Sequence, residues 1–445
     1  MSSMLEHGPE DVDAGAAPVY ADGPAPNVAP RADDVEAVGA VAPAPAGAAR
    51  HGWWMLGVLS LLMGFASIST DLYLPAMPAM GLSLRASAGT VEWTVSGYLV
   101  GFSLGQLLWG PVSDRHGRRL PVAIGIALFV IGSAGCALAG DVSSIIAWRI
   151  VQAVGASAGV VLSRAMVRDL YEGHRAAQML STLITVMAIA PLLGPIVGGQ
   201  ILVFAGWRAI FWTLVGVGLV TLVALITLPE TLSDDRRSRD SLGRALGRYG
   251  ELLRRPRLLG YAGAGGCLYA GMFAYIAGSP FAFIAYHRLP AQLYGLLFAA
   301  GIVGIMAANM INVRLLPRNG SDRLLTAGTV MAAASALVVA LAAETDWGGL
   351  WGLAVPLFVF ASSTGLIVAN SIAGALSDFP KQAGTVSALV GAMQYGSGIL
   401  GSGLVGAFAD GTPRPMGWVI ALFGVGSFLS ARLLLTARPK RAGPA

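Results

Sequence analysis

Apolar segments of about 20 residues recur along the chain from Trp53 onward, and short polar stretches separate them. A helix of about 20 residues crosses the roughly 30 Å of hydrocarbon in a bilayer. The pattern therefore predicts an all-α membrane protein with twelve transmembrane helices. We expect these helices at 53–78, 90–111, 119–139, 143–165, 176–204, 207–228, 258–286, 292–315, 323–343, 348–371, 383–408 and 415–435.

The longest polar break between apolar segments is rich in arginine and separates six predicted helices from the next six. The start of the chain is different, because Ala, Pro, Gly and acidic residues dominate it and cannot bury enough apolar surface to fold. It also lacks the pattern of a signal peptide. The predicted organisation is a disordered cytoplasmic tail at 1–50, a six-helix bundle at 51–229, a cytoplasmic linker at 230–257, a second six-helix bundle at 258–436 and a cytoplasmic tail at 437–445.

Basic residues favour one side of the predicted membrane, since they gather in alternate loops and in the linker. The opposite side receives only Arg85, Arg208, Arg288 and Arg414. Cytoplasmic loops carry the excess of Lys and Arg in membrane proteins, so both termini and the linker are expected in the cytoplasm. The two halves also echo each other weakly, as secondary transporters built from repeats do.

Composition agrees with a membrane protein, because only 12% of the residues are charged and 55% are hydrophobic. A soluble domain has about 25% charged residues. The net charge of +5 is spread over loops, which favours a lipid bilayer over nucleic acid as the partner. Cys136 and Cys267 lie far apart inside apolar segments, so neither a disulfide nor a metal site is expected.

An enzyme embedded in the membrane would need paired carboxylates, a His cluster or a nucleophile at membrane depth. His116, His174 and His287 fall in loops or at a helix end, and no such cluster is visible in the sequence. We therefore expect no enzyme activity and no cofactor.

A single carboxylate, that of Asp71, lies near the end of the first apolar segment. An ionised side chain at membrane depth is costly unless it is paired, so such residues usually carry function. Arg149 lies inside the fourth segment and must face a polar cavity or a carboxylate, unless it snorkels to the outer interface. Gln152 shares its helix face. The sequence indicates Asp71 as a candidate proton or cation site and Arg149 as its candidate coupling partner.

The turn between the second and third segments reads GPVSDRHGRR at 110–119. Its glycine allows a tight turn, and its charges can pair across helix ends to hold the cytoplasmic side closed. An ordinary basic loop is the alternative. The candidate gating residues here are Asp114, Arg115, Gly117 and Arg118.

This run resembles the loop signature of the major facilitator superfamily. The run RIVQAVGA at 149–156 resembles a signature of its drug:proton antiporters, and APLLGPIVGG at 190–199 resembles one associated with exporters. The segment TDLYLPAMP at 70–78 is similar to the first-helix motif of the Bcr/CflA-type multidrug exporters, which confer bicyclomycin and chloramphenicol resistance. The resemblance is strong over residues 52–230 and looser in the second half.

The resemblance implies a major facilitator fold and a monomeric transporter of the bacterial inner membrane. This transporter would exchange protons for drugs or other small amphipathic compounds by alternating access. A proton-coupled exporter of an endogenous metabolite, such as a sugar or amino-acid derivative, fits the same residues. The exporter signature is thought to act as hinge and seal between the halves, which adds the gating candidates Gly194, Pro195, Gly198 and Gly199.

Two positions depart from the family pattern. Some relatives carry another acid two turns before the position of Asp71, where this chain has Met63. Val313 replaces the Asp in the matching loop of the second half, so that loop is expected to contribute less to gating. Coupling is therefore expected to depend on Asp71.

Aromatic and amide side chains supply a candidate substrate cavity, since drug pockets are mostly apolar with a few polar anchors. Each of them is alternatively a core or lipid-facing residue, and an amide at depth can instead join two helices. The candidate cavity residues are Tyr73, Gln152, Tyr269, Phe273, Gln394 and Tyr395, with Tyr275 as a further one.

Overall fold

The computed structural model describes residues 46–171, 173–233, 250–377 and 383–435, together with Arg237 and Phe379. Helices joined by short connections make up these described residues, and none of them lies in a strand. The predicted tails up to residue 45 and from residue 436, and most of the predicted linker, lie outside them. All contacts given below fall within Gly52–Ala445, which forms one unit.

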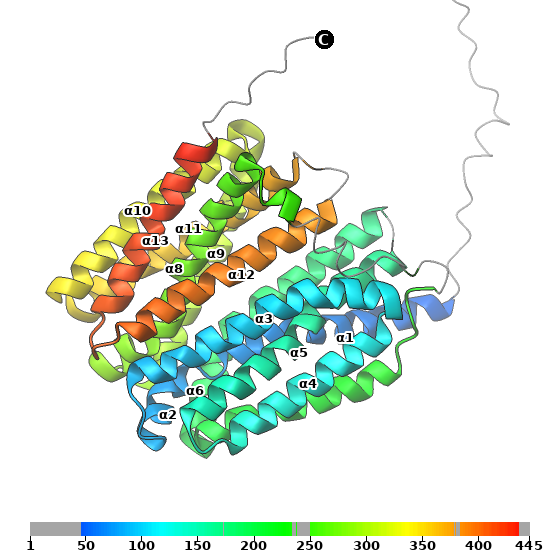
Figure 1. Ribbon diagram of the computed structural model, residues 1–445, viewed down its shortest axis with the longest axis horizontal. Helices are drawn as coiled ribbons and strands as arrows, with labels where there is room; N and C mark the ends of the chain where they lie inside the picture. The colour runs from blue at the N-terminus through cyan, green and yellow to red at the C-terminus, as the bar shows by residue number, and fades with distance from the viewer. Residues whose placement is uncertain are drawn as a thin grey trace, which may run out of the picture. The chain divides into compact units, whose positions relative to one another are not determined.

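The described chain forms a bundle of long helices (Figure 1), which confirms the predicted all-α class. The elements are α1 (Ala46–Asp71), η2 (Leu74–Ala76), α2 (Met77–Ser83), α3 (Ala88–His116), α4 (Arg119–Leu138), α5 (Val142–Leu170), α6 (Gly173–Ile226), α8 (Pro256–Pro280), the π-helix η4 (Phe281–Tyr286), α9 (Ala291–Asn319), α10 (Ser321–Thr345), α11 (Gly349–Ser377), α12 (Ala383–Ala407) and α13 (Arg414–Leu435).

Nine helical segments in the described ranges are long and apolar enough to cross a membrane. One of them lies on α6, which turns sharply at Gly206 (φ 77°) and carries both the fifth and the sixth predicted segments. The predicted segments at 90–111 and 383–408 lie on α3 and α12, which are not among the nine. The membrane class is confirmed, and the count of twelve crossing helices stays a prediction.

The first predicted helix is interrupted, which the apolar pattern did not indicate. It begins at Ala46 rather than Trp53, because the alanine-rich end of the predicted tail has a high helix propensity. It ends at Asp71, and a short 3₁₀ turn leads into α2. Pro75 and Pro78 lack the N–H groups that would continue α1. Each proline lies instead in the first turn of a new helix, Pro75 in η2 and Pro78 in α2. Asp71 is therefore the last residue of a broken helix.

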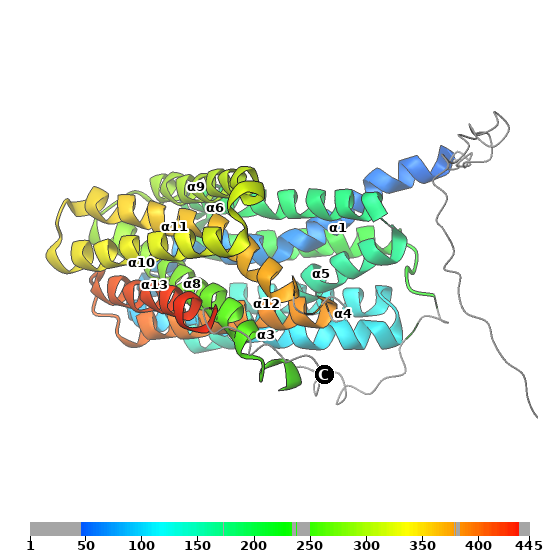
Figure 2. The same ribbon diagram turned by 90° about the horizontal axis from the view of Figure 1, so that it is seen from above.

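The first six predicted segments and the last six meet through two helix pairs. The helix α3 packs along α12, as Figure 1 shows, and α6 packs along α9 (Figure 2). Ser96 Oγ lies 2.8 Å from Ser402 Oγ across the first pair. A Cβ on Gly89 would overlap the carbonyl oxygen of Gly406, so these backbones touch. Both contacts lie toward the end with few arginines, which we call the predicted outer end.

Candidate functional site

Arg149 is fully buried in the first half of the protein, between two aromatic rings. Its guanidinium carbon lies 4.2 Å from the ring centre of Tyr73 and 4.3 Å from that of Tyr98. Its Nη1 donates hydrogen bonds to the backbone oxygen of Ser69 (2.8 Å) and to Oε1 of Gln152 (2.7 Å). The side chain therefore points into the protein and does not snorkel to the outer interface.

The break in the first helix explains why the Ser69 carbonyl is available to Arg149. In a continuous helix this oxygen would accept the N–H of Tyr73. The last backbone bond of α1 runs instead from Leu72 N to Ile68 O (3.1 Å). The last carbonyls of a helix need partners from outside the helix, and the guanidinium supplies one of them. Broken helices provide ion and substrate sites in many transporters for the same reason.

Tyr73 and Gln152 position Arg149 in this structure. The Tyr73 hydroxyl lies 3.1 Å from Thr94 Oγ1, and Gln152 Nε2 donates to Ser133 Oγ (2.7 Å). Both side chains are fully buried. Sequence reasoning named them as cavity residues, but in this conformation neither has surface that a substrate can contact.

Asp71 lies at the end of α1 with a side chain that is only 5% exposed. Within the described ranges it makes no hydrogen bond through its carboxylate and no ion pair with Arg149. The arginine is held by Ser69 and Gln152 instead. Asp71 on α1 and Arg149 on α5 are thus neighbours, but their charged groups make no direct contact in this conformation. An unpaired carboxylate in such a place is costly when it is ionised.

The glycines of the exporter-like segment allow α6 to pack directly against this break. A Cβ on Gly194 would lie 3.0 Å from the Cβ of Asp71. A Cβ on Gly198 would overlap the backbone oxygen of Leu72. Glycine at these two positions lets helix and break approach closely, as small residues do at helix interfaces in membranes. The candidate gate therefore touches the candidate proton site.

The same segment also reaches the second half of the protein through α9. A Cβ on Gly199 would lie 3.0 Å from the backbone oxygen of Ala291. On the other helix, a Cβ on Gly295 would lie 2.8 Å from the backbone oxygen of Pro195. Contacts on both sides place this part of α6 between Asp71 and the other half at the predicted outer end.

Replacing Gly198 by alanine is expected to lower both stability and transport. The new methyl group would meet the Leu72 backbone, which cannot move aside without shifting the break after Asp71. Overpacking of this kind costs about 1–3 kcal/mol. Thermal unfolding of the purified protein measures the change. Gly216→Ala on the same helix is the matched control, because a Cβ there meets nothing within 4 Å. Equal stability of the two variants would contradict the prediction.

Aromatic side chains from both halves meet in one cluster, which we call the ring cluster (Tyr98, Phe102, Tyr269, Phe273 and Tyr395). The ring centres of Phe102 and Tyr395 are 4.6 Å apart, which joins α3 to α12. Tyr395 also lies 5.5 Å from Tyr269 and 5.9 Å from Phe273 on α8. Three of the predicted cavity residues are therefore together between the halves.

Sequence reasoning missed Tyr98 and Phe102. Their ring centres are 6.0 Å apart, and the Tyr98 ring also covers the guanidinium of Arg149. The two side chains thus connect the buried arginine to the ring cluster. Their spacing of four residues puts them on one helix face, which is the signal that could have found them.

Gln394 lies beside the ring cluster on α12, with 3% of its surface exposed. Its Nε2 has no hydrogen-bond partner among the described residues. A Cβ on Gly265 would lie 3.0 Å from that nitrogen, so the amide faces α8. Buried polar groups nearly always have partners, and a free amide donor is therefore a candidate anchor for a substrate.

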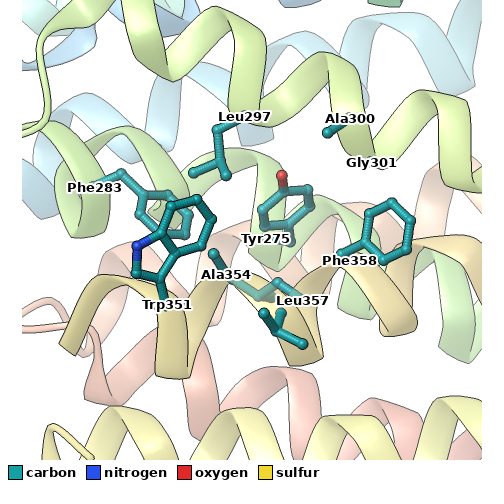
Figure 3. A pocket seen from close by; sticks show the side chains of 10 residues that line it. Tyr275, Phe283, Leu297, Ala300, Gly301, Trp351, Ala354, Leu357 and Phe358 are labelled. Carbon is teal, nitrogen blue, oxygen red and sulfur yellow. The ribbon is translucent and has the colours of Figure 1, made fainter. Parts of the chain in front are cut away.

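Tyr275 does not join the ring cluster, because two helical residues after Phe273 it faces another side of α8. It lines a hollow of about 170 Å³ among α8, α9 and α11 (Figure 3). The walls are apolar, and two of the lining side chains, Trp351 (68%) and Phe358 (42%), are exposed. This exposure of large apolar side chains suits contact with lipid.

The predicted gating loop forms a charged network around Arg118. Its Nε donates to Asp169 Oδ2 on α5 (2.8 Å), and its Nη1 donates to Asp114 and to Ser113 Oγ (2.7 Å). Arg115 is exposed. All of these residues belong to the first half. A network that held the cytoplasmic side closed would bridge the two halves. In the described part of the chain this network does not reach the second half.

Glu230 is a member of this network that sequence reasoning missed. It lies just after α6, far from the loop in sequence, so no local pattern signals it. Gly117 adopts a φ of 84°, and a Cβ there would lie 2.8 Å from Glu230 Oε2, so the turn requires glycine. The backbone donors to this carboxylate are Arg118 N (2.8 Å), Arg119 N (3.0 Å), Thr231 N (3.0 Å) and Leu232 N (3.0 Å).

The stability that Glu230 provides is expected to depend on pH. Burial alone would raise the pKa of Glu230, but the backbone hydrogen bonds hold that pKa below its ordinary value of 4.5. A group with a lowered folded pKa contributes stability above its unfolded pKa and loses it as the pH falls through the folded pKa. Glu230→Gln should therefore unfold at a lower temperature than wild type at neutral pH, and this difference should shrink below about pH 4.5.

Thermal unfolding of both proteins at a series of pH values measures this difference. Glu251→Gln is the matched control, since Glu251 is exposed and its carboxylate accepts no hydrogen bond in the described ranges. A difference between wild type and Glu230→Gln that stays constant with pH would refute the assignment.

Comparison with known proteins identifies the family of the chain. The model of the Major Facilitator Superfamily matches residues 59–402. The "Uncharacterized MFS-type transporter YdgK" of Bacillus subtilis is 34% identical over 84% of this chain and 92% of its own. The "Bicyclomycin resistance protein homolog" of Haemophilus influenzae is 29% identical over 87% and 97%. The "Chloramphenicol resistance protein" of Pseudomonas aeruginosa is 31% identical over 80% and 84%.

Solved structures agree on the fold. The xylose transporter XylE of E. coli, in a partially occluded inward open conformation, superposes with a TM-score of 0.66 at 17% identity. The match covers 88% of this chain and 99% of the transporter. The relatives are transporters rather than enzymes, as the sequence predicts. The chain therefore belongs to the major facilitator superfamily, within its Bcr/CflA-type branch of multi-pass membrane transporters.

Proposed function

We propose that the protein exports drugs or other small amphipathic compounds across the bacterial inner membrane in exchange for protons, by alternating access. The observation that carries this proposal is the position of Asp71. Its carboxylate is buried and unpaired at the end of a broken helix, directly against the glycines of α6. The names of the relatives, a bicyclomycin resistance protein homolog and a chloramphenicol resistance protein, support drugs as the exported compounds.

Protonation of Asp71 decides how closely α6 can pack. With the proton bound, no charge is buried when Gly194 and Gly198 close over the break, so the outer end stays shut. Loss of the proton leaves a carboxylate that needs water or Arg149, and close packing against α6 becomes unfavourable. A ligand shifts a conformational equilibrium only through different affinities for the two states. The proton binds the outward-closed state better, and the exported compound binds the deprotonated form.

The exported compound binds between the halves at the ring cluster. Tyr269, Phe273 and Tyr395 offer apolar surface, and the free Nε2 of Gln394 offers one directed hydrogen bond. A mostly apolar site with a single polar anchor suits amphipathic compounds of varied shape. The arrangement of Arg118 within the first half supports an inward-facing state, in which this site is filled from the cytoplasm.

Transport by purified protein in liposomes tests this function. Chloramphenicol is the probe, and an imposed pH gradient is the only source of energy. We expect accumulation of the probe with the gradient and none after a protonophore dissipates it. Accumulation that is equal with and without the gradient would refute proton coupling.

A susceptibility panel tests the substrate class, in cells that lack other drug pumps and express the protein. We expect raised resistance to several amphipathic antibiotics. Proton-coupled transport without resistance to any compound of the panel would favour the export of an endogenous metabolite.

A further inference from the structure

Glu92 is a second carboxylate buried at the predicted outer end, and the site around Asp71 does not use it. It lies on α3, one turn before Ser96, which contacts Ser402 on α12. Only 3% of its surface is exposed, and its Oε2 has neither solvent contact nor a hydrogen-bond partner among the described residues.

Glu92 lines a small hollow whose wall is otherwise made mostly by residues of the second half. This wall includes Phe281 on η4, Val405 on α12, Thr412 in the following loop and Met416 on α13. The hollow beside the carboxylate measures about 10 Å³. A cavity needs roughly 10–15 Å³ to hold one water molecule, so the space excludes a drug or a hydrated cation.

In the part of the chain that the structure describes, no charged side chain of the surrounding elements pairs with Glu92. The nearby loop carries Asp410, which binds the Thr412 N–H and hydroxyl, and Arg414, which points toward Glu344 (3.8 Å). Arg85, in the connection after α2, is exposed. His287, which follows η4, packs against Phe283 in a tilted arrangement and against Tyr286 edge-on. Asp141 caps the N-terminus of α5, where its carboxylate accepts a hydrogen bond from the Ser144 N–H.

We propose that Glu92 is a second proton-binding site, which takes its proton from the outer aqueous phase and must hold it for the outer end to close. The closed wall offers no donor or cation to an ionised carboxylate, whereas a neutral carboxyl fits beside apolar groups. When α3 separates from α12 and α13, water reaches the group and the proton can leave. By linkage, a proton that binds better to the closed state favours closure by the same factor.

This inference rests on the proposed proton exchange and adds a site to it. Asp71, at the break in the first helix, must release its proton to the cytoplasm. Glu92 senses the outer solution, on the other helix pair. A low outer pH would therefore favour closure through Glu92 in addition to the effect of Asp71.

Distance measurements between spin labels test the proposal without requiring transport. Leu82→Cys on α2 and Trp347→Cys before α11 place labels on exposed positions of the two halves, with Cys136 and Cys267 replaced by alanine. We expect the population with separated labels to rise at least tenfold from acid to alkaline pH. Glu92→Gln, which imitates the protonated side chain, should keep the closed distance at every pH, whereas Glu92→Asp should still titrate.

The matched control is Glu344→Gln, an exposed glutamate at the same end, which should titrate as wild type does. Asp71→Asn should likewise keep the labels at the closed distance, because asparagine imitates the protonated Asp71, so transport rather than label distance separates the two sites. A Glu92→Gln protein that opens with pH as wild type does would overturn the proposal. Normal proton-coupled transport by Asp71→Asn would overturn only the proposed role of Asp71.

Infrared difference spectra between acid and alkaline pH give a second measurement on the folded protein. A buried protonated carboxyl group has its own C=O band, which should disappear in Glu92→Gln and remain in Glu344→Gln. Identical carboxyl bands in wild type and Glu92→Gln would contradict proton binding at this position.

Discussion

Asp71→Asn is expected to reduce gradient-driven efflux to the level of liposomes without protein, while the protein stays folded. Asparagine has the shape of the protonated side chain, so the packing of α6 over the break is kept. Swaps that conserve volume usually cost less than about 1.5 kcal/mol of stability. The amide cannot release a proton. The variant therefore stays in the outward-closed state that the protonated Asp71 favours. Substrate-induced proton release from the reconstituted protein measures the loss directly.

Asp346→Asn provides the matched control for this experiment. Asp346 is exposed in the connection between α10 and α11, and its φ of 53° suits asparagine as well as aspartate. It should transport and release protons as wild type does. Thermal unfolding and gel filtration should show all three proteins folded. Normal proton release by Asp71→Asn would remove the central assignment, whatever the result at other sites.

The helices were predictable from the sequence because a bilayer demands long apolar runs. All twelve predicted segments lie on described helices, including 176–204 and 207–228 on the two sides of Gly206. The break after Asp71 was not predicted, although Pro75 and Pro78 carry its signal. Prolines inside an apolar segment were read as part of one helix, whereas here they start new ones.

The sequence predicted which residues belong to the candidate site better than it predicted the contacts among them. Asp71 and Arg149 stand out because charges are rare at membrane depth. Their relative position depends on the rotation of α1 and α5, which an apolar pattern in lipid does not fix. The same holds for Tyr98, whose ring lies over the arginine, and for Glu230, whose contacts with the loop at 117–119 arise only in the folded chain.

Arg149→Lys is expected to slow transport by roughly 10- to 100-fold although the charge is kept. The guanidinium is planar, lies between the rings of Tyr73 and Tyr98, and donates to both Ser69 and Gln152. Lysine presents a compact point charge that cannot reproduce the stacking of a planar group between the two rings. A lost hydrogen bond to a charged group costs about 1.5–3 kcal/mol, and each 1.36 kcal/mol is a factor of ten. Rates in liposomes under a fixed pH gradient measure the effect.

Arg208→Lys is the matched control, because this chain offers a second arginine stacked on an aromatic ring. The guanidinium of Arg208 lies 4.2 Å from the ring of Trp207 and donates to the Ala139 carbonyl (3.1 Å), but the residue is exposed. Water replaces its lost contacts, so transport should change little. Full transport activity of Arg149→Lys would mean that transport needs only a positive charge at position 149. Equal loss in both variants would mean that the effect comes from general destabilisation rather than from the broken helix at Ser69.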